Sequence, residues 1–377
     1  MKSKKIIKII VYIIAIISIA CLAAYIYFYT KSSPNEISIE EKISQMIVIG
    51  YDKSNKSLKN LEKDINNGNI SGVIFYKRNI KNPEQIKNQI EHFNKISKAK
   101  YPLFMMLDQE GGKVSRITDN NGFKVYPSAK EVSKFNKEKA HNAYYEMATD
   151  LKNIGINFNV APCVDVKINP KSSIASDSRI YSENPKVVTD YSLEFINAHN
   201  AAKVITAIKH FPGLGNAEFD THKTLPDITN SWKETELIPF KSILEKYPKE
   251  PVMVGHVINK KIDSNNISSL SSKTISVLNN SMNHEGIVIA DAIDMSAVED
   301  YSIEDILVKS INSGVNLFIF PNHVQNENNS KIYMRPEFFI KTVKEAINSG
   351  KISTDKIDTS YNKIIDLKQM FILNDLN

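Results

Sequence analysis

Short apolar runs alternate with longer amphipathic stretches through residues 38–372. The runs are rich in β-branched and aromatic residues, and they are continuously apolar, which is typical of parallel strands buried on both faces. Eight such runs begin at Met46, Gly72, Leu103, Asn157, Val204, Val252, Ile287 and Leu317. Eight strands with intervening helices predict an α/β fold, a (β/α)8 barrel of the TIM type, although two smaller doubly wound domains would show the same alternation.

Several positions between the runs carry signals for helix ends. Asn184-Pro185 places a capping residue before a proline at the first helical position. Residues 302–305, Ser-Ile-Glu-Asp, resemble a capping box. Gly155, Gly286 and Gly314 each stand just before an apolar run, where a left-handed glycine commonly ends a helix. These signals support helices between the strands.

Polar side chains favour the barrel over two separate domains. Several runs end in a charged or titratable residue, and these residues are Asp108, Lys209, His210, His256 and Asp291. The carboxyl ends of barrel strands meet at one face, where the loops build the active site. Charged groups on so many strand ends are difficult to explain as core packing, so we expect them to converge on one mouth.

The N-terminal residues predict a membrane anchor. Residues 1–8 are basic, residues 9–29 carry no charge, and residues 30–37 form a short polar linker. An apolar segment of this length can span a bilayer, and the positive-inside rule places the following domain outside the cell. A cleaved signal peptide is the alternative, with cleavage after residues 18–20 or lipid attachment at Cys21. In each case the domain that follows is expected to be extracellular, at the cell membrane or secreted.

Net charge and cysteine count argue against a nucleic-acid-binding protein and against a fold held by disulfides. The chain has 377 residues, 42% of them hydrophobic, and a formal charge of +6 that lies partly in residues 1–8. This modest charge predicts no nucleic-acid partner. The two cysteines are Cys21 and Cys163, so the exported body has no internal disulfide and depends on its core.

Two carboxylates and a histidine are candidates for catalysis. Asp291 ends an otherwise uncharged strand, where it is a candidate nucleophile or electrostatic stabiliser. A helix N-cap is the alternative, but Asp294 is better placed for that. Asp220 and His222 follow the fifth strand, and an aspartate bonded to a histidine makes a proton carrier near neutral pH. Gly213 and Gly215 would loosen the loop that carries them.

A metal site is the alternative use of these histidines. His210, Asp220, His222 and His256 are residue types that bind zinc. Lys209, however, would place an ammonium beside the cation, and the chain has no HxxxH or HExxH spacing here. The sequence therefore favours proton transfer over metal binding.

The segment LDQEGGKVSRI, residues 107–117, indicates binding of a hydroxyl-rich ligand. A strand-end carboxylate such as Asp108 accepts hydrogen bonds from sugar hydroxyls, and Arg116 donates in a planar fork. Taken alone, the two glycines that follow Glu110 indicate only a turn, and Arg179 resembles a surface arginine.

Together these motifs resemble glycoside hydrolase family 3, in particular its single-domain β-N-acetylhexosaminidase branch. The family has a DQEGGRVxR segment, and this chain has DQEGGKVSR over residues 108–116. The family also has KHFPGHGxTxxDSH, and this chain has KHFPGLGNAEFDTH over residues 209–222. GINFNVAPCVDV and IVIADAIDM look like further family blocks, and the resemblance covers residues 38–370 in order.

The resemblance implies a retaining exo-β-N-acetylglucosaminidase that needs no metal ion or other cofactor. Asp291 would be the nucleophile that forms a glycosyl-enzyme intermediate, and His222, oriented by Asp220 on a mobile loop, would be the acid/base. The residues expected to hold N-acetylglucosamine are Asp108, Arg116, Arg179, Lys209 and His210. The expected substrates are N-acetylglucosamine-containing glycans, in particular peptidoglycan fragments.

Three departures from the family pattern affect residues without an assigned chemical role. Leu214 replaces the histidine of PGHG, which is the second histidine of the KHFPGHG segment. Residues 216–217 replace a polar Asp-Thr pair, and Ala292 replaces the second aspartate of Asp-Asp-Leu. Two alternatives follow. One is a phosphorylase, because a histidine acid/base does not repel incoming phosphate as a carboxylate would. The other is a non-catalytic sugar-binding barrel.

Overall fold

The computed structural model describes residues 18–21, 37–217, 225–292, 301–321 and 335–373. Contacts divide the chain into two units, Met1–Ser38 and Ile39–Asn377. In the first unit, residues 18–21 are helical. The basic segment 1–8, the rest of the predicted anchor 9–29 and nearly all of the linker 30–37 lie outside the described residues. None of the helices in the described ranges combines the length and apolar character that crossing a membrane requires.

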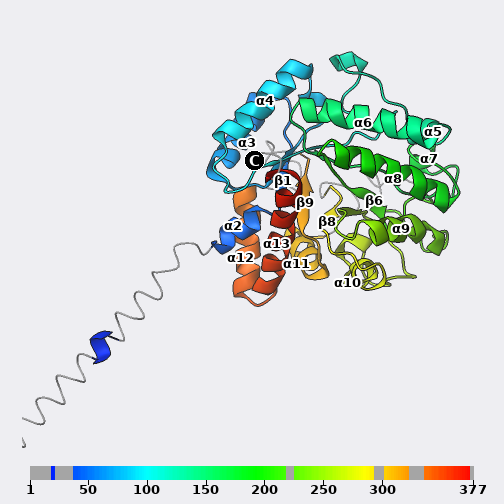
Figure 1. The fold of residues 1–377 in the computed structure, drawn as a ribbon. Coiled ribbons are helices and arrows are strands. Elements are labelled where there is room, and N and C mark those ends of the chain that lie inside the picture. The colour runs from blue at the N-terminus through cyan, green and yellow to red at the C-terminus, as the bar shows by residue number, and fades with distance from the viewer. Residues whose placement is uncertain (1–17, 22–36, 218–224, 293–300, 322–334, 374–377) are drawn as a thin grey trace, which may run out of the picture. The chain divides into compact units, whose positions relative to one another are not determined.

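The second unit is built on one parallel sheet, seen at the centre of Figure 1. Its strands, in sheet order, are β5 (Ile205–Thr206), β4 (Phe158–Asn159), β3 (Phe104–Leu107), β2 (Gly72–Ile74), β1 (Ile47–Ile49), β9 (Leu317–Phe320), β8 (Val288–Ala290), β7 (Val252–Val254) and β6 (Ile208–Phe211). All of the predicted apolar runs form strands, and every residue of these strands is buried. This agrees with continuously apolar runs covered on both faces.

The two edge strands of the sheet, β5 and β6, are consecutive in the chain and are separated only by Ala207. β5 pairs with β4 and β6 pairs with β7, so one stretch of chain joins both edges. The Ala207 N–H donates to Ala161 O at 3.0 Å, and the Val164 N–H donates to Lys209 O at 2.7 Å. The sheet therefore closes into a barrel with eight strand positions, which confirms the TIM-type prediction over two doubly wound domains.

Helices form a layer around the strands (Figure 1). They are α2 (Ile39–Ser44), α3 (Asn55–Asn67), α4 (Pro83–Ile96), α5 (Ala129–Val132), α6 (Lys137–Asn153), α7 (Ser173–Ser176), α8 (Pro185–Ala201), α9 (Ile238–Lys246), α10 (Ser272–Ser276), α11 (Ile303–Ser313), α12 (Pro336–Asn348) and α13 (Thr354–Phe371). Each long helix turns an apolar stripe inward; α4, for example, buries Ile86, Ile90 and Phe93. The short helix α2 packs against α12 and α13.

Most of the predicted helix ends are confirmed. Asn184 caps α8 by accepting from the Lys186 N–H, and Ser302 caps α11 by accepting from the Asp305 N–H. Gly155 and Gly314 have φ of 90° and 112° after α6 and α11, as expected. The prediction of a left-handed glycine is wrong for Gly286, because this residue is not among those with a positive φ. A Cβ at Gly286 would lie 2.4 Å from Lys249 O, so close backbone packing explains this glycine.

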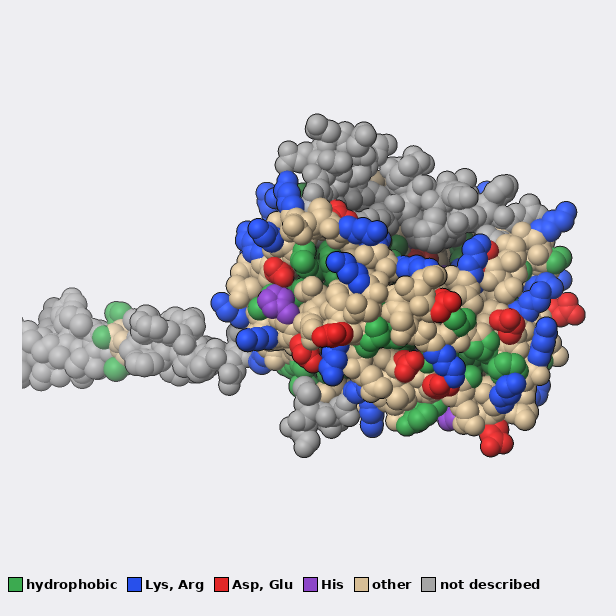
Figure 2. Space-filling view, turned by 90° about the horizontal axis from the view of Figure 1, so that it is seen from above, with side chains coloured by type: hydrophobic (Ala, Val, Ile, Leu, Met, Phe, Trp, Pro, Cys, Tyr) green, Lys and Arg blue, Asp and Glu red, His purple; other side chains and the backbone are tan. Residues whose placement is uncertain are grey.

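The face seen in Figure 2 carries basic and acidic side chains interspersed among neutral ones. Such mixed surfaces remain well solvated. Buried polar side chains, in contrast, gather at the mouth of the barrel, where Lys209 and His210 are 2% and 6% exposed.

Candidate active site

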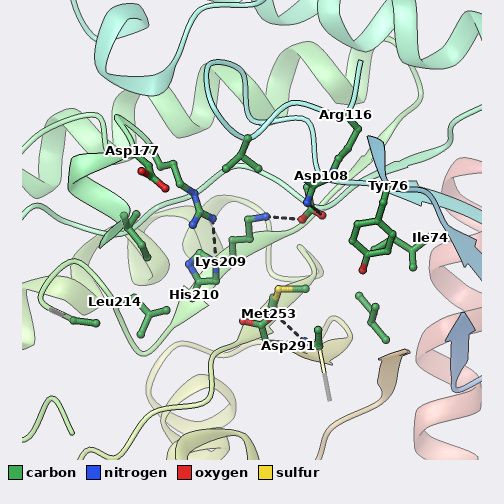
Figure 3. Close-up of a pocket in the computed structure, with 16 residues that line it drawn as sticks. Ile74, Tyr76, Asp108, Arg116, Asp177, Lys209, His210, Leu214, Met253 and Asp291 are labelled. Carbon is green, nitrogen blue, oxygen red and sulfur yellow. Dashed lines mark hydrogen bonds and ion pairs between the residues drawn. The ribbon is translucent and has the colours of Figure 1, made fainter. Parts of the chain in front are cut away.

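A pocket of about 310 Å³ lies at the carboxyl ends of the strands (Figure 3). Its polar lining residues come from many elements: Tyr76 after β2, Asp108 after β3, Lys209 and His210 on β6, and Asp291 after β8. The pocket is further lined by Ile74, Val114, Arg116, Ile174, Asp177, Arg179, Leu214, Ala217, Met253, Ala292 and Ile319. The predicted convergence of strand-end groups is thus present for four of the five residues.

A β-bulge explains how two consecutive residues of β6 both reach the pocket. Ile208 pairs with Val252 and Phe211 pairs with Val254, so β6 has one residue more than β7 between these pairs. Neighbouring residues of a regular strand point to opposite faces, whereas a bulge redirects side chains and is common beside active sites. Lys209 and His210 therefore both line the cavity.

Asp108 is the centre of a buried ion network. Its Oδ1 accepts from Lys209 Nζ at 2.8 Å and its Oδ2 from Arg116 Nη2 at 2.9 Å. Burial alone would raise the pKa of Asp108, but the charges of Lys209 and Arg116 outweigh burial and hold the pKa well below its usual value. The carboxylate is therefore ionised, and each oxygen keeps a lone pair that can accept from a ligand hydroxyl.

Glu110 joins Arg179 to this network. Arg179 Nε and Nη2 donate to the two oxygens of Glu110 at 2.8 Å each, a bidentate pair, and Lys209 Nζ lies 2.9 Å from Glu110 Oε1. Burial opposes ionisation of Glu110, but Arg179 and Lys209 lower its pKa to about 2. The two carboxylates together raise the pKa of Lys209 despite its burial. Arg179 is thus a partly buried residue that lines the pocket, rather than a surface arginine.

His210 is held in one tautomer by its two partners. Its Nδ1 lies 2.8 Å from Asp165 Oδ2, and its Nε2 lies 3.3 Å from Arg179 Nη2. Because a guanidinium only donates, Nε2 is the acceptor and Nδ1–H donates to Asp165. Asp165 also accepts from the Leu214 N–H and from the Cys163 thiol, at 2.6 and 3.1 Å. His210 and the hydrogen bonds from the Leu214 N–H and the Cys163 thiol lower the pKa of Asp165, although burial alone would raise it.

Asp291 faces the pocket from the end of β8, as Figure 3 shows. Its N–H donates to Val254 O at 3.1 Å, and its Oδ1 accepts from the Ala292 N–H at 2.8 Å. His256 supports the backbone here, since its Nε2 lies 3.2 Å from both Asp291 O and Ala292 O. Its Nδ1 accepts from Ser269 Oγ at 2.6 Å. His256 is thus a buried backbone anchor, and it is not among the lining residues of the pocket.

Asp220 and His222, the predicted proton-transfer pair, lie outside the described residues. The glycines before them have a packing role that the sequence did not reveal. A Cβ on Gly215 would lie 1.6 Å from Val166 O, and Gly213 has a φ of 119° with Glu236 against it. Close packing therefore accounts for both glycines, and the predicted loop movement stays a prediction.

One group of potential metal ligands occurs in the described part of the chain: Cys163, Asp165 and His210. Their hydrogen bonds do not suit a metal ion. Nδ1 of His210 carries the proton that binds Asp165, and burial and the charge of Asp165 raise the pKa of the Cys163 thiol. A thiol and a protonated ring nitrogen are not ligands, so this group is explained as the support of His210.

Sequence reasoning missed several residues of the site. The motif around Glu110 indicates only a turn, so the sequence does not reveal its ion pairs with Arg179 and Lys209. Asp165 lies in the family-like block GINFNVAPCVDV, but nothing in that block indicates its bond to His210. Tyr76 lines the pocket with its ring 4.3 Å from the Arg78 guanidinium carbon and 5.4 Å from that of Arg116. Its place directly after the β2 run was the only available signal.

Known proteins resemble this chain over most of its length. The family model described as the glycosyl hydrolase family 3 N terminal domain matches residues 38–367. Beta-hexosaminidase A of Pseudoalteromonas piscicida is 28% identical over 330 residues, which cover 82% of this chain and 54% of that protein. Beta-hexosaminidase of Haemophilus influenzae Rd is 26% identical over 330 residues, covering 80% of this chain and 91% of that protein.

Solved structures give the same result. A glycoside hydrolase family 3 beta-N-acetylglucosaminidase from Paenibacillus sp. FPU-7 superposes with a TM-score of 0.80 at 26% identity, over 90% of this chain and 64% of that one. Beta-N-acetylhexosaminidase from Beutenbergia cavernae, at 20% identity and a TM-score of 0.77, is similar in fold over 89% of this chain and 99% of that chain. The chain thus spans about half of the first relative and about two thirds of the first structure. Its match over residues 38–367 shows that it belongs to the glycosyl hydrolase family 3 N terminal domain family.

Proposed function

We propose that this chain is a retaining exo-β-N-acetylglucosaminidase that removes terminal β-linked N-acetylglucosamine. The observation that carries the proposal is the placement of Asp291 opposite the network of Asp108, Lys209 and Arg179 in one pocket of about 310 Å³. This volume lies at the lower end of the range for pockets that bind small ligands. The names of the relatives, beta-hexosaminidase and beta-N-acetylglucosaminidase, support the same substrate class.

The network would bind the sugar through its hydroxyl groups. Asp108 retains acceptor lone pairs, and Arg116, Arg179 and Lys209 supply donors from fixed positions. Because every one of these charges is compensated by a neighbour, the site is organised before the ligand arrives. Preorganised donors and acceptors lower the cost of holding the sugar in a reactive geometry.

The reaction would proceed in two displacements. The Asp291 carboxylate attacks the anomeric carbon while His222, oriented by Asp220, donates a proton to the departing glycosidic oxygen. A water molecule then gives its proton to His222 and attacks the same carbon, which breaks the bond to Asp291 and restores the starting configuration. A histidine in this role differs from the usual pair of carboxylates in retaining glycosidases.

We propose peptidoglycan fragments as the natural substrates and the outer face of the cell membrane as the location. The location is supported by the basic residues 1–8 and the uncharged residues 9–29 that follow them. A membrane-anchored domain would meet cell-wall glycans directly. Separation of membrane and soluble fractions, with and without signal peptidase inhibition, would test the anchor against a cleaved signal peptide.

Release of 4-nitrophenol from 4-nitrophenyl N-acetyl-β-glucosaminide tests the activity. We expect turnover in phosphate-free buffer that Asp291→Ala and His222→Ala each reduce by several orders of magnitude. Asp366→Asn, an exposed aspartate on α13, is the control for loss of a carboxylate and keeps full activity. Turnover that requires phosphate would instead establish a phosphorylase, and binding of N-acetylglucosamine without any turnover would establish a sugar-binding barrel.

A further inference from the structure

The segment 213–217, directly after β6, forms one wall of the sugar pocket through Leu214 and Ala217. Two buried carboxyl groups from other parts of the chain hold its backbone. The Leu214 N–H donates to Asp165 Oδ1 at 2.6 Å, and the Gly215 N–H donates to Glu236 Oε2 at 3.0 Å. Successive N–H groups of one wall are therefore fixed by two different acids.

Glu236 fits closely against this wall. It lies on the 3-10 helix η3 (Glu234–Leu237) and is completely buried. A Cβ at Gly213 would lie 2.7 Å from both Cβ and Oε2 of Glu236. On the other side, a Cβ at Gly215 would lie 1.6 Å from Val166 O. The wall is thus enclosed between η3 and the segment after β4, and each contact depends on a glycine.

The two acids differ in their hydrogen bonding. Asp165 accepts from His210 Nδ1, the Cys163 thiol and the Leu214 N–H, as an ionised carboxylate does. In the described part of the chain, Glu236 accepts from the Gly215 N–H through Oε2, whereas its Oε1 is buried without a geometrically formed hydrogen bond. A buried oxygen without donors is poorly suited to carry negative charge, and much better suited to be protonated.

The charges around Glu236 act in the same direction. Burial and the nearby Asp165 carboxylate raise the pKa of Glu236 to about 8. The opposing influences are weaker and come from the N–H groups of Lys233 and Gly215 and from the Lys233 side chain on its own element. His210 faces Asp165 from β6, and its bond to that carboxylate keeps Asp165 ionised.

We propose that Glu236 is a positioning residue for the sugar pocket. Its carboxyl holds the wall 213–217 while it is protonated, and its ionisation places a second negative charge beside the Asp165 carboxylate, which repels it, displaces the wall and weakens sugar binding. The proposed function enters only through the choice of N-acetylglucosamine as ligand. Glu236 touches the backbone of the wall and is not among the lining residues of the pocket.

The chain carries a reporter at this position. Trp232 is its only tryptophan, is buried, and donates from Nε1 to Pro212 O at 2.9 Å. It belongs to the same small apolar cluster as Leu214 and Ala217. Tryptophan fluorescence, excited where tyrosine does not absorb, therefore reports on the wall without any need for turnover.

The experiment compares the full chain with Glu236→Gln, which keeps the shape and an acceptor oxygen but does not titrate. We expect the fluorescence of the unaltered chain to change with a midpoint near pH 8, and that of Glu236→Gln to remain flat through this range. The Kd for N-acetylglucosamine should weaken about tenfold through the same range in the unaltered chain only, as expected when a second negative charge appears beside Asp165 and displaces the wall that both acids hold. Thermal unfolding at acid pH verifies that the variant is folded.

Glu236→Ala provides the second variant, because it removes the acceptor of the Gly215 N–H at every pH. We expect its Kd to be weakened about tenfold already below the transition, with kcat reduced less than KM is raised. A transition near pH 8 that persists in Glu236→Gln, or a Glu236→Ala Kd equal to that of the unaltered chain, would overturn the proposal. Since fluorescence and ligand binding are measured directly, absence of hydrolysis would refute the proposed activity and leave this test intact.

Discussion

Glu110 tests whether the ion network of the pocket stabilises the fold, because its carboxylate bridges Arg179 and Lys209. The perturbation is Glu110→Gln, which keeps the shape of the side chain and one acceptor oxygen but removes the charge shared by Arg179 and Lys209. Its amide NH2 would face donors instead of accepting from them. Lys209 is nearly inaccessible and the Arg179 side chain is 16% exposed, so water replaces the missing partner poorly.

The size of the effect follows from burial. Removing one partner of a buried ion pair costs about 3–5 kcal/mol of unfolding free energy, and the oxygen that Gln keeps argues for the lower end, about 3 kcal/mol. A folded unit of about 340 residues has an unfolding entropy of roughly 0.7 kcal/mol/K, from the average per residue. A loss of about 3 kcal/mol then lowers Tm by about 4 °C.

The assay is thermal unfolding of the full chain followed by circular dichroism. The matched control is Glu146→Gln, which removes the same charge from an ion pair with Lys124 whose side chains are 50% and 55% exposed. Exposed pairs contribute about 0–1 kcal/mol, so this control should lower Tm by about 1 °C or less. Equal Tm values for the two variants would refute the reasoning that burial makes the Glu110 network a stabilising framework of the pocket.

Three further predictions concern buried groups elsewhere in the barrel. Burial lowers the pKa of Lys368 to about 7, so above that pH the unfolded chain binds a proton that the folded chain has lost. The free energy of unfolding in urea, relative to that of Lys368→Met, should therefore rise by about 3 kcal/mol between about pH 7 and about pH 9.5. A difference that stays constant over this range would contradict the prediction. Burial raises the pKa of Glu250 to about 8, so between about pH 4.5 and about pH 8 the folded chain keeps a proton that the unfolded chain has lost. Relative to Glu250→Gln, the free energy of unfolding should therefore fall by about 4 kcal/mol as the pH rises through this range. A rise would refute the raised pKa of Glu250. Gly215→Ala should lower Tm and raise the Kd for N-acetylglucosamine far more than Gly350→Ala, which strains a φ of 74° but has nothing within 4 Å of its Cβ. Gly215 is not among the positive-φ glycines, so a loss no greater than that of Gly350→Ala would contradict the contact with Val166 O as the reason for this glycine.

The fold was predictable because its strands leave a strong mark in the sequence. A barrel strand covered by helices must be apolar on both faces, and every apolar run named from the sequence became a strand. The strand ends then identified Asp108, Lys209, His210 and Asp291 as pocket residues before any geometry was known. His256 stands at a strand end too, but its ring turns to the backbone of Asp291 and Ala292. A strand end locates a residue, and only packing determines where its side chain points.

The partners of these residues could not be predicted from spacing. Glu110 pairs with Arg179, 69 positions away, and Asp165 pairs with His210, 45 positions away. These contacts arise where loops from different strands meet, and loop paths have no periodic signature. The bulge in β6 was equally hidden, because the apolar run around Lys209 is compatible with a regular strand. Glycines were ambiguous for the same reason, since flexibility and close packing both select a residue without a side chain.

The departures from the family pattern acquire a physical explanation in the structure. Leu214 is buried in an apolar cluster that includes Ile228 and Trp232, and its only polar contact with the acids beneath the wall is made by its backbone N–H. A leucine at this position keeps that hydrogen bond and adds apolar burial, which a histidine would supply less well. Ala292 likewise acts through its N–H, which donates to Asp291 Oδ1.

Both positions therefore contribute through the backbone, which any non-proline residue supplies. Replacing a histidine or a carboxylate there removes a side chain but leaves the bonds that fix Leu214 against Asp165 and Ala292 against Asp291. A decayed, non-catalytic barrel should instead have lost the costly buried charges, because unpaired or unused ions in a protein interior are destabilising. The complete compensation of Asp108, Glu110, Lys209 and Arg179 shows that these charges are paired, so the pocket keeps the preorganised polar lining that the proposed sugar binding requires.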